Sequence, residues 1–187
     1  GSVGSDAAEY VRWLADHGVD TSGVRVSATL ASPRFTVTTD RAQNQIGSFY
    51  PGAMAEAADI ALDDVEVDLV LVSPNDPGAM LRHTQECRDR GVPFAADPSQ
   101  TLTFLDGEAI RSLVTGATYL FTNEYEAGLV HAKTGWSDAD VLELVQTRVT
   151  THGAKGVVVQ RKGEPDLHVG VVPAEVVADP TGVGDGF

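Results

Sequence analysis

The chain has 187 residues, of which 42% are hydrophobic and 21% charged, a composition typical of a globular protein with one substantial core. Its 27 acidic residues outnumber its 13 lysines and arginines, and a formal net charge of −14 repels phosphate backbones and anionic lipids. We therefore expect neither nucleic acid nor a membrane as a partner. The single cysteine, Cys87, cannot form an internal disulfide, and there is neither a membrane-spanning apolar run nor a secretory pattern, so we predict a cytoplasmic protein.

The first part of the chain predicts a helix followed by a small β element. Apolar side chains recur at helical spacing over residues 5–17, and Gly18 supplies a stop. Residues 24–50 then change to short segments rich in Val, Thr and Phe, which are typical of hairpins. We interpret residues 24–50 as a separate β element, and residues 1–23 and 51–187 as parts of one main α/β domain.

After residue 68 the pattern alternates between strands and helices. The run Leu69 to Val72 is unbroken and apolar, which is typical of a strand buried on both faces. The alternation predicts a mostly parallel, Rossmann-like sheet flanked by helices, with functional sites at the carboxyl ends of the strands. The predicted strands are residues 69–72, 94–96, 119–121 and 156–160, and the predicted helices are residues 80–90, 107–114, 124–133 and 137–152.

Three strand ends carry polar residues suited to chemistry: Asp97 to Gln100, Thr122 to Glu126, and Asp179 to Asp185. In the last of these, Gly182 and Gly184 allow a tight turn whose N–H groups converge on one point, and a helix beginning there adds its positive dipole end. Such a concavity stabilises a phosphoryl group during transfer, and an Asp at its rim can accept a proton from an alcohol. Taken alone, a Gly-x-Gly turn before a helix is also compatible with an ordinary loop.

The whole string from Asp179 to Asp185 resembles the Asp-Thr-x-Gly-Ala-Gly-Asp signature of the ribokinase-like (PfkB) kinases. That resemblance implies the ribokinase-like fold, with a small β lid at residues 24–50, and ATP as the phosphoryl donor. It also implies roles for the residues of the string: Asp185 as the catalytic base, Gly182, Val183 and Gly184 as the anion hole, and Asp179 and Thr181 as ligands of a monovalent cation, usually potassium.

A second motif, Asn123-x-x-Glu126, directly follows a predicted strand. Taken alone, these two residues are compatible with a helix cap and a solvated glutamate. In the ribokinase-like kinases an Asn-x-x-Glu element at this place organises magnesium, water and the nucleotide phosphates. The resemblance therefore implies Mg²⁺ as a cofactor, with Glu126 acting through water because magnesium keeps much of its hydration shell.

The lid segment suggests the substrate. The run from Gln45 to Met54 is similar to bacterial adenosine kinases of the actinobacterial type, which implies phosphorylation of the 5′-hydroxyl of adenosine in purine salvage. Phe35 and Phe49 are candidates for clamping the adenine by stacking, and Gln100 for reading a purine edge. Aromatic residues in a short β element are also common core residues. Because lid strands in this family often pair between subunits, a homodimer is a further expectation.

The chain departs from the family in two places. Where the family usually has a Thr/Ser-x-Gly stretch that lines the ATP site, this chain has residues 160–164, with the sequence Gln-Arg-Lys-Gly-Glu. Family members also continue beyond both ends of this sequence, so we expect the 187 residues alone to be inactive or poorly folded. Two alternatives to an adenosine kinase stay open: a ribokinase-like sugar kinase, and a non-catalytic fragment that binds a nucleoside or a protein.

Overall fold

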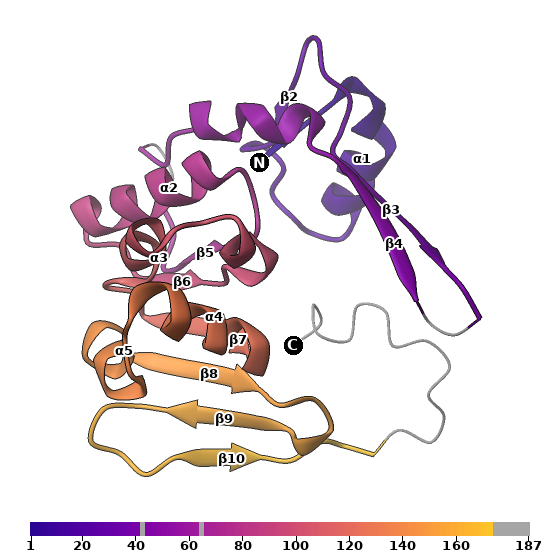
Figure 1. Ribbon diagram of the computed structural model, residues 1–187. Coiled ribbons are helices and arrows are strands. Elements are labelled where there is room, and N and C mark those ends of the chain that lie inside the picture. Colours follow the sequence, from indigo (N-terminus) through magenta and orange to yellow (C-terminus); the bar gives the residue numbers. More distant parts are fainter. Residues whose placement is uncertain (42–43, 64–65, 174–187) are drawn as a thin grey trace.

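A computed structural model describes residues 1–41, 44–63 and 66–173 (Figure 1). Its main sheet has the strand order β10-β9-β8-β7-β6-β5, in which β5 to β8 are parallel and β9 and β10 are antiparallel to their neighbours. The strands are β5 (Val70–Val72), β6 (Phe94–Ala96), β7 (Tyr119–Asn123), β8 (Thr147–Thr151), β9 (Val157–Gln160) and β10 (Leu167–Val169). The predicted mostly parallel sheet is confirmed.

Four α-helices connect or follow these strands: α2 (Pro77–Arg90), α3 (Gly107–Val114), α4 (Glu124–Thr134) and α5 (Asp138–Leu144). Side-chain caps begin them, since Asp76 accepts a hydrogen bond from the Ala79 amide and Asp106 from the Ala109 amide. Their apolar faces bury a single core against the sheet, which includes Met80 of α2, Ile110 of α3 and Leu120 of β7. None of the helices in the described ranges has the length and apolar character needed to cross a membrane.

The predicted helix over residues 137–152 is wrong in its second half. Helix α5 ends at Leu144, and Thr147–Thr151 forms strand β8, which pairs in parallel with β7. Most residues of this strand are β-branched, a composition that favours the extended conformation, while the spacing of Val141, Val145 and Val149 mimics a helical face. Strand β9 follows after a short turn, which is why it runs antiparallel to β8.

The expectation that residues 69–72 are buried on both faces is also corrected. Strand β5 is an edge strand, and neighbouring residues point to opposite faces of the sheet. Val72 is only 5% exposed and packs in the core, whereas Leu71 is 61% exposed and lines a cavity. The two neighbouring apolar residues of this run therefore lie on opposite faces of the sheet, one in the core and one in the cavity.

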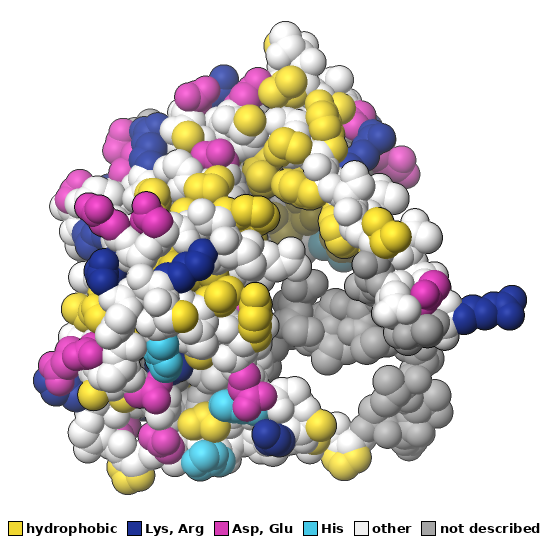
Figure 2. All heavy atoms as spheres, in the orientation of Figure 1, with side chains coloured by type: hydrophobic (Ala, Val, Ile, Leu, Met, Phe, Trp, Pro, Cys, Tyr) yellow, Lys and Arg dark blue, Asp and Glu magenta, His cyan; other side chains and the backbone are white. Residues whose placement is uncertain are grey.

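The N-terminal part contains the predicted helix and hairpin. A short η1 turn (Ser5–Ala7) leads into α1 (Ala8–Asp16), and β1 (Ser2–Val3) pairs with β2 (Arg25–Val26). The antiparallel hairpin of β3 (Arg34–Thr39) and β4 (Gln45–Tyr50) projects away from the main sheet (Figure 1). On the face drawn in Figure 2, hydrophobic side chains gather beside this lid, while acidic and basic ones are scattered over the body.

The segments that connect the lid hairpin to the body pack tightly against each other. Gly52, the first residue of the η2 helix (Gly52–Asp59), has a φ of +47°, and a Cβ atom there would lie 2.2 Å from the Ala31 carbonyl oxygen. The Ala53 amide donates to that same oxygen at 2.9 Å. Only glycine fits this contact, which fixes the strand leaving the lid against the segment that enters it.

Candidate active site

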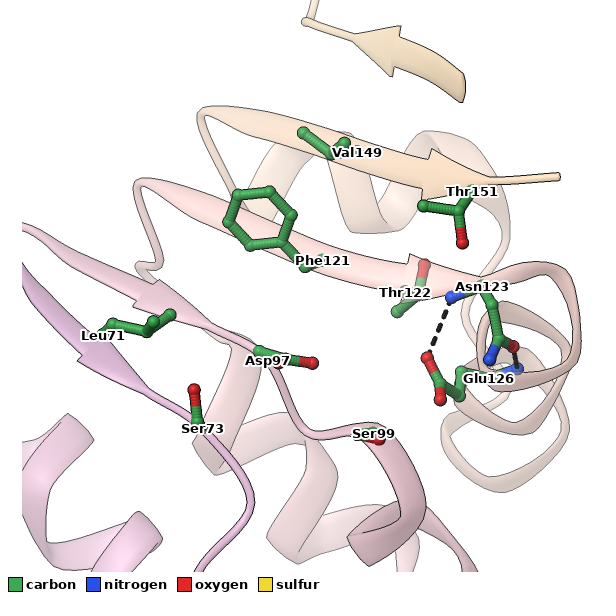
Figure 3. A pocket seen from close by; sticks show the side chains of 10 residues that line it. All are labelled: Leu71, Ser73, Asp97, Ser99, Phe121, Thr122, Asn123, Glu126, Val149 and Thr151. Carbon is green, nitrogen blue, oxygen red and sulfur yellow. Dashed lines mark hydrogen bonds between the residues drawn. The ribbon is translucent and has the colours of Figure 1, made fainter. Parts of the chain in front are cut away.

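A cavity of about 340 Å³ opens at the carboxyl edge of the parallel strands. Its polar rim comes from residues at or just after four strand ends: Ser73 after β5, Asp97 after β6, Asn123 in β7 and Thr151 in β8 (Figure 3). Its apolar walls are the side chains of Leu71, Phe121 and Val149 (Figure 3). A polar rim around an apolar pocket at this edge is the usual place of a ligand site in open α/β sheets.

Asn123 and Glu126 form a reciprocal capping box at the start of α4. The Glu126 amide donates to Asn123 Oδ1 at 2.8 Å, and the Asn123 amide donates to Glu126 Oε2 at 2.8 Å (Figure 3). The simple explanation of these residues as a helix cap is therefore correct. Both side chains also line the cavity, and the box does not use the side-chain nitrogen Nδ2 of Asn123 or Oε1 of Glu126. Those two groups are what the motif can offer to a ligand.

The N-terminus of α4 is tied to the end of β8 behind this box. His152 Nδ1 lies 2.8 Å from Glu124 Oε1, and this hydrogen bond, with the charge of Lys155, lowers the pKa of the Glu124 carboxyl. In register, Asn123 of β7 is paired with Thr151 of β8. The pair thus joins the two strand ends that carry Asn123 and Thr151.

Glu124 and His152 line a second cavity of about 410 Å³, which lies between α4, α5 and strands β8 to β10. Arg148 reaches it from β8 with a side chain that is only 6% exposed, and it forms an ion pair with Asp138. The bond from Arg148 lowers the pKa of the Asp138 carboxyl. In the described ranges, no group of three or more His, Cys, Asp or Glu side chains is arranged to hold a metal ion.

Ser99 lines the first cavity and has an unusual backbone. It begins the η3 helix (Ser99–Thr103) with a φ of +41°, and it is the one residue other than glycine with positive φ among those described. Such a conformation costs on the order of 1–3 kcal/mol and concentrates at functional sites. Lys133 supports the segment, since its Nζ donates to the carbonyl oxygens of Leu102, Thr103 and Leu105.

The structure brings together some of the candidate residues. Asn123 and Glu126 meet in the first cavity, whereas Gln100 is exposed on η3 and does not line it. Phe35 and Phe49 are opposite neighbours in the lid, 64% and 54% exposed, and do not line it either. The candidates of the terminal string lie outside the described residues: Asp179, Thr181, Gly182, Val183, Gly184 and Asp185.

The sequence did not single out the rim residues Ser73 and Thr151, and it indicated Ser99 only as part of a polar strand end. Ser73 directly follows a predicted strand, so the rule that sites lie at strand ends was sufficient to find it. Ser99 lies within the polar segment from Asp97 to Gln100 but carries no motif of its own. Thr151 was hidden because its strand was predicted as helix.

A mostly parallel sheet, a β lid and a polar cavity at the carboxyl edge define a ribokinase-like α/β protein. The chain matches the model of the pfkB family carbohydrate kinases over residues 1–187, and it therefore belongs to this family. A nucleoside kinase from Burkholderia thailandensis, solved with inosine, is 36% identical, with a TM-score of 0.93 over 99% of this chain and 62% of that one. The same protein was solved with ADP-inosine, with a TM-score of 0.88 over 99% of this chain and 58% of that one.

A curated relative agrees with these structures. The nucleoside kinase of Methanocaldococcus jannaschii is 25% identical over 178 residues, which are 95% of this chain and 58% of that protein. The chain thus spans about three fifths of the length of the relatives it matches. The resemblance to the ribokinase-like kinases is confirmed, and the Burkholderia and Methanocaldococcus relatives are both nucleoside kinases.

Proposed function

We propose that the protein containing this chain is an ATP-dependent kinase that phosphorylates the 5′-hydroxyl of adenosine. The observation that carries the proposal is the placement of Asn123 and Glu126, with Asp97, in a cavity at the carboxyl edge of the sheet, in a chain of which 99% matches part of a nucleoside kinase. The complexes of the Burkholderia relative with inosine and with ADP-inosine support a purine nucleoside as acceptor and an adenine nucleotide as donor.

The cavity residues fit a magnesium ion held through water. Glu126 and Asp97 bring carboxylate oxygens to one space, and oxygen atoms are the ligands that Mg²⁺ prefers. Since the capping box occupies Glu126 Oε2, Oε1 is the oxygen that we assign to the hydrated ion. When bound, Mg²⁺ neutralises charge on the nucleotide phosphates.

The chemical step is assigned to the terminal string. Asp185 accepts the proton of the 5′-hydroxyl as its oxygen attacks the γ-phosphorus, while the bond from that phosphorus to the ADP oxygen breaks. The amides of Gly182, Val183 and Gly184 donate to the oxygens of the moving phosphoryl group. We assign Asp179 and Thr181 to a potassium ion beside this anion hole.

The proposed substrate clamp is the lid. Phe35 and Phe49 present exposed rings on one face of the hairpin, and base–aromatic stacking is worth roughly 1–3 kcal/mol per base. Gln100 follows Ser99 of the rim, which places an amide near the cavity for a purine edge.

The opposite lid face carries Ile46 and Tyr50, which we propose as a homodimer contact, in a cytoplasmic enzyme. Sedimentation of the Ile46→Lys variant tests that contact.

The test of the reaction is Asp185→Asn in a protein of the relatives' full length. We expect turnover to disappear while adenosine affinity measured by calorimetry stays nearly unchanged. Loss of adenosine binding with normal turnover of bound substrate would reject the assignment.

A panel of adenosine, inosine and ribose decides among the acceptors, because a sugar kinase would prefer ribose. Adenosine binding without any turnover in the unmutated protein would instead support a non-catalytic nucleoside-binding protein.

A further inference from the structure

The tip of the Phe35 ring lies close to Gly47 on the neighbouring lid strand. In the β3–β4 register Phe35 is opposite Phe49, and Val37 is opposite Gly47, so these four residues share one face of the hairpin. A Cβ atom added to Gly47 would lie 2.8 Å from Cε2 and 2.9 Å from Cζ of Phe35. The ring therefore leans diagonally across the two strands and occupies the space that a side chain at position 47 would need.

Only glycine leaves room for this arrangement. Carbon atoms make van der Waals contact at about 3.5–4.0 Å, so a methyl group at Gly47 would force the ring to leave its position. Only Cε2 and Cζ of the ring lie within 4 Å of that Cβ position, so the ring approaches Gly47 with the edge that these two atoms form. With 64% of Phe35 exposed, much of the ring is turned to solvent. The pair thus makes an exposed aromatic platform whose position depends on the absence of a side chain at Gly47.

We propose that Gly47 determines the preference for acceptors that carry a base, by leaving room for the Phe35 ring in a position where a purine can stack on it. The inference rests on the proposed function, because it assumes that the lid closes over a nucleoside. A platform of this kind recognises the π-face that every purine has and a free sugar lacks. It therefore separates nucleosides from ribose, rather than adenosine from inosine.

The energetic reason is preorganisation. A ring that must first be ordered loses part of the stacking energy as side-chain entropy, whereas a ring already packed on Gly47 does not. The adjacent residue Ser48 points to the opposite face of the strand, as does its cross-strand partner Thr36. The chain thus offers a matched position at which a small substitution should not touch the platform.

The test compares Gly47→Ala with Ser48→Ala in the full-length protein, using calorimetry with adenosine and with ribose. We expect Gly47→Ala to weaken adenosine binding about tenfold, within the range of one stacked base, and to leave the response to ribose unchanged. Ser48→Ala should bind both as the unmutated protein does. Unchanged adenosine affinity in Gly47→Ala would overturn the role of Gly47 while leaving the kinase assignment intact.

A double variant separates the platform from general damage to the lid. In the Phe35→Ala background no ring occupies the space above Gly47, so adding Gly47→Ala should weaken adenosine binding no further. A second, additive loss would overturn the proposal, because it would show that the methyl group acts through the hairpin backbone. An unmutated protein that acts on ribose and binds no nucleoside would reject the proposed substrate itself, a result distinct from either outcome for Gly47.

Discussion

The Asp6 carboxylate lies 2.7 Å from the guanidinium of Arg34, and this ion pair ties the body of the protein to the first residue of lid strand β3. The same carboxylate accepts hydrogen bonds from the Ser32 amide at 2.8 Å and from its hydroxyl at 2.7 Å. These bonds, Ser32 first, lower the pKa of Asp6 to about 2. A single side chain thus holds the segment that leads directly to Phe35.

This anchor should fail in acid. Because the folded-state pKa of Asp6 is below the usual value of about 3.9, its contribution is fully present above that value and is lost as the pH falls through about 2. Amide exchange at Ser32 should therefore be faster in Asp6→Asn than in the unmutated protein at pH 6, and the two rates should converge only below the pKa of Asp6. Asp20→Asn is the control, since the Asp20 carboxylate bonds to Ser22, two residues along the chain, and lies outside the Ser32 contact. Equal exchange at pH 6 would contradict the anchor.

The capping box predicts that Asn123 has a measurable structural role besides any functional one. Asn123→Ala removes the acceptor for the Glu126 amide and should lower the free energy of unfolding by about 1 kcal/mol. Asn123→Ser, which keeps a capping oxygen, should restore most of that loss. Urea unfolding of the three proteins checks this, and equal stability of the alanine and serine variants would argue against the cap.

Glu126 allows charge to be separated from capping. Glu126→Gln keeps a side-chain oxygen for the Asn123 amide, so its stability should stay within about 0.5 kcal/mol of the unmutated protein. If the carboxylate acts on hydrated Mg²⁺, the variant should lose the magnesium-dependent part of its ATP affinity and keep the rest. Calorimetry with ATP, with and without Mg²⁺, measures this difference, and an unchanged magnesium effect would confine Glu126 to the cap.

Much of the fold could be predicted from the sequence because its signals are local. Capped starts at Asp106 and Asn123 and an apolar face on residues 107–114 define helices without any knowledge of the neighbours. Strand β8 was missed because its Val149 continues the helical spacing of Val141 and Val145, and only pairing with β7 decides between the two periods. Leu71 was misplaced for a similar reason, since an edge position cannot be known from the strand's own residues.

The candidate site also contains residues that a local motif predicts and residues that only the sheet topology brings together. Asn123 and Glu126 were found because a short motif holds both partners within four residues, and their proximity follows from the start of a helix. Ser73, Asp97 and Thr151 come from separate strand ends, so their meeting depends on strand order and register. The Phe35 platform depends on a diagonal contact across two strands with Gly47, which single-residue propensities do not encode.

Lys133 should stabilise the segment that carries Ser99. Its Nζ donates to three carbonyl oxygens at 2.7, 2.9 and 2.8 Å, those of Leu102, Thr103 and Leu105. Lys133→Met keeps the aliphatic packing but leaves these acceptors to water or unpaired, so we expect a loss of about 2 kcal/mol in urea unfolding. Lys155→Met, at a lysine whose side chain is 79% exposed, should cost less than about 0.5 kcal/mol. Similar losses in both variants would contradict a specific role for Lys133.

In the ion pair of Arg148 and Asp138 only the arginine is buried, so removing either partner should have a different effect on stability. Asp138→Asn leaves a guanidinium that is 6% exposed without its anion and should cost about 2 kcal/mol, whereas Arg148→Met leaves an aspartate that water can solvate. The double variant should then be more stable than Asp138→Asn alone. Because folding lowers the pKa of Asp138, its carboxylate stabilises the fold at pH values above its unfolded-state pKa. The free energy of unfolding should therefore fall as the pH drops below about 4 in the unmutated protein, and it should fall less in Asp138→Asn. Thermal unfolding from pH 3 to 7 measures both effects, and additive single losses would mean that the two side chains do not act as a pair.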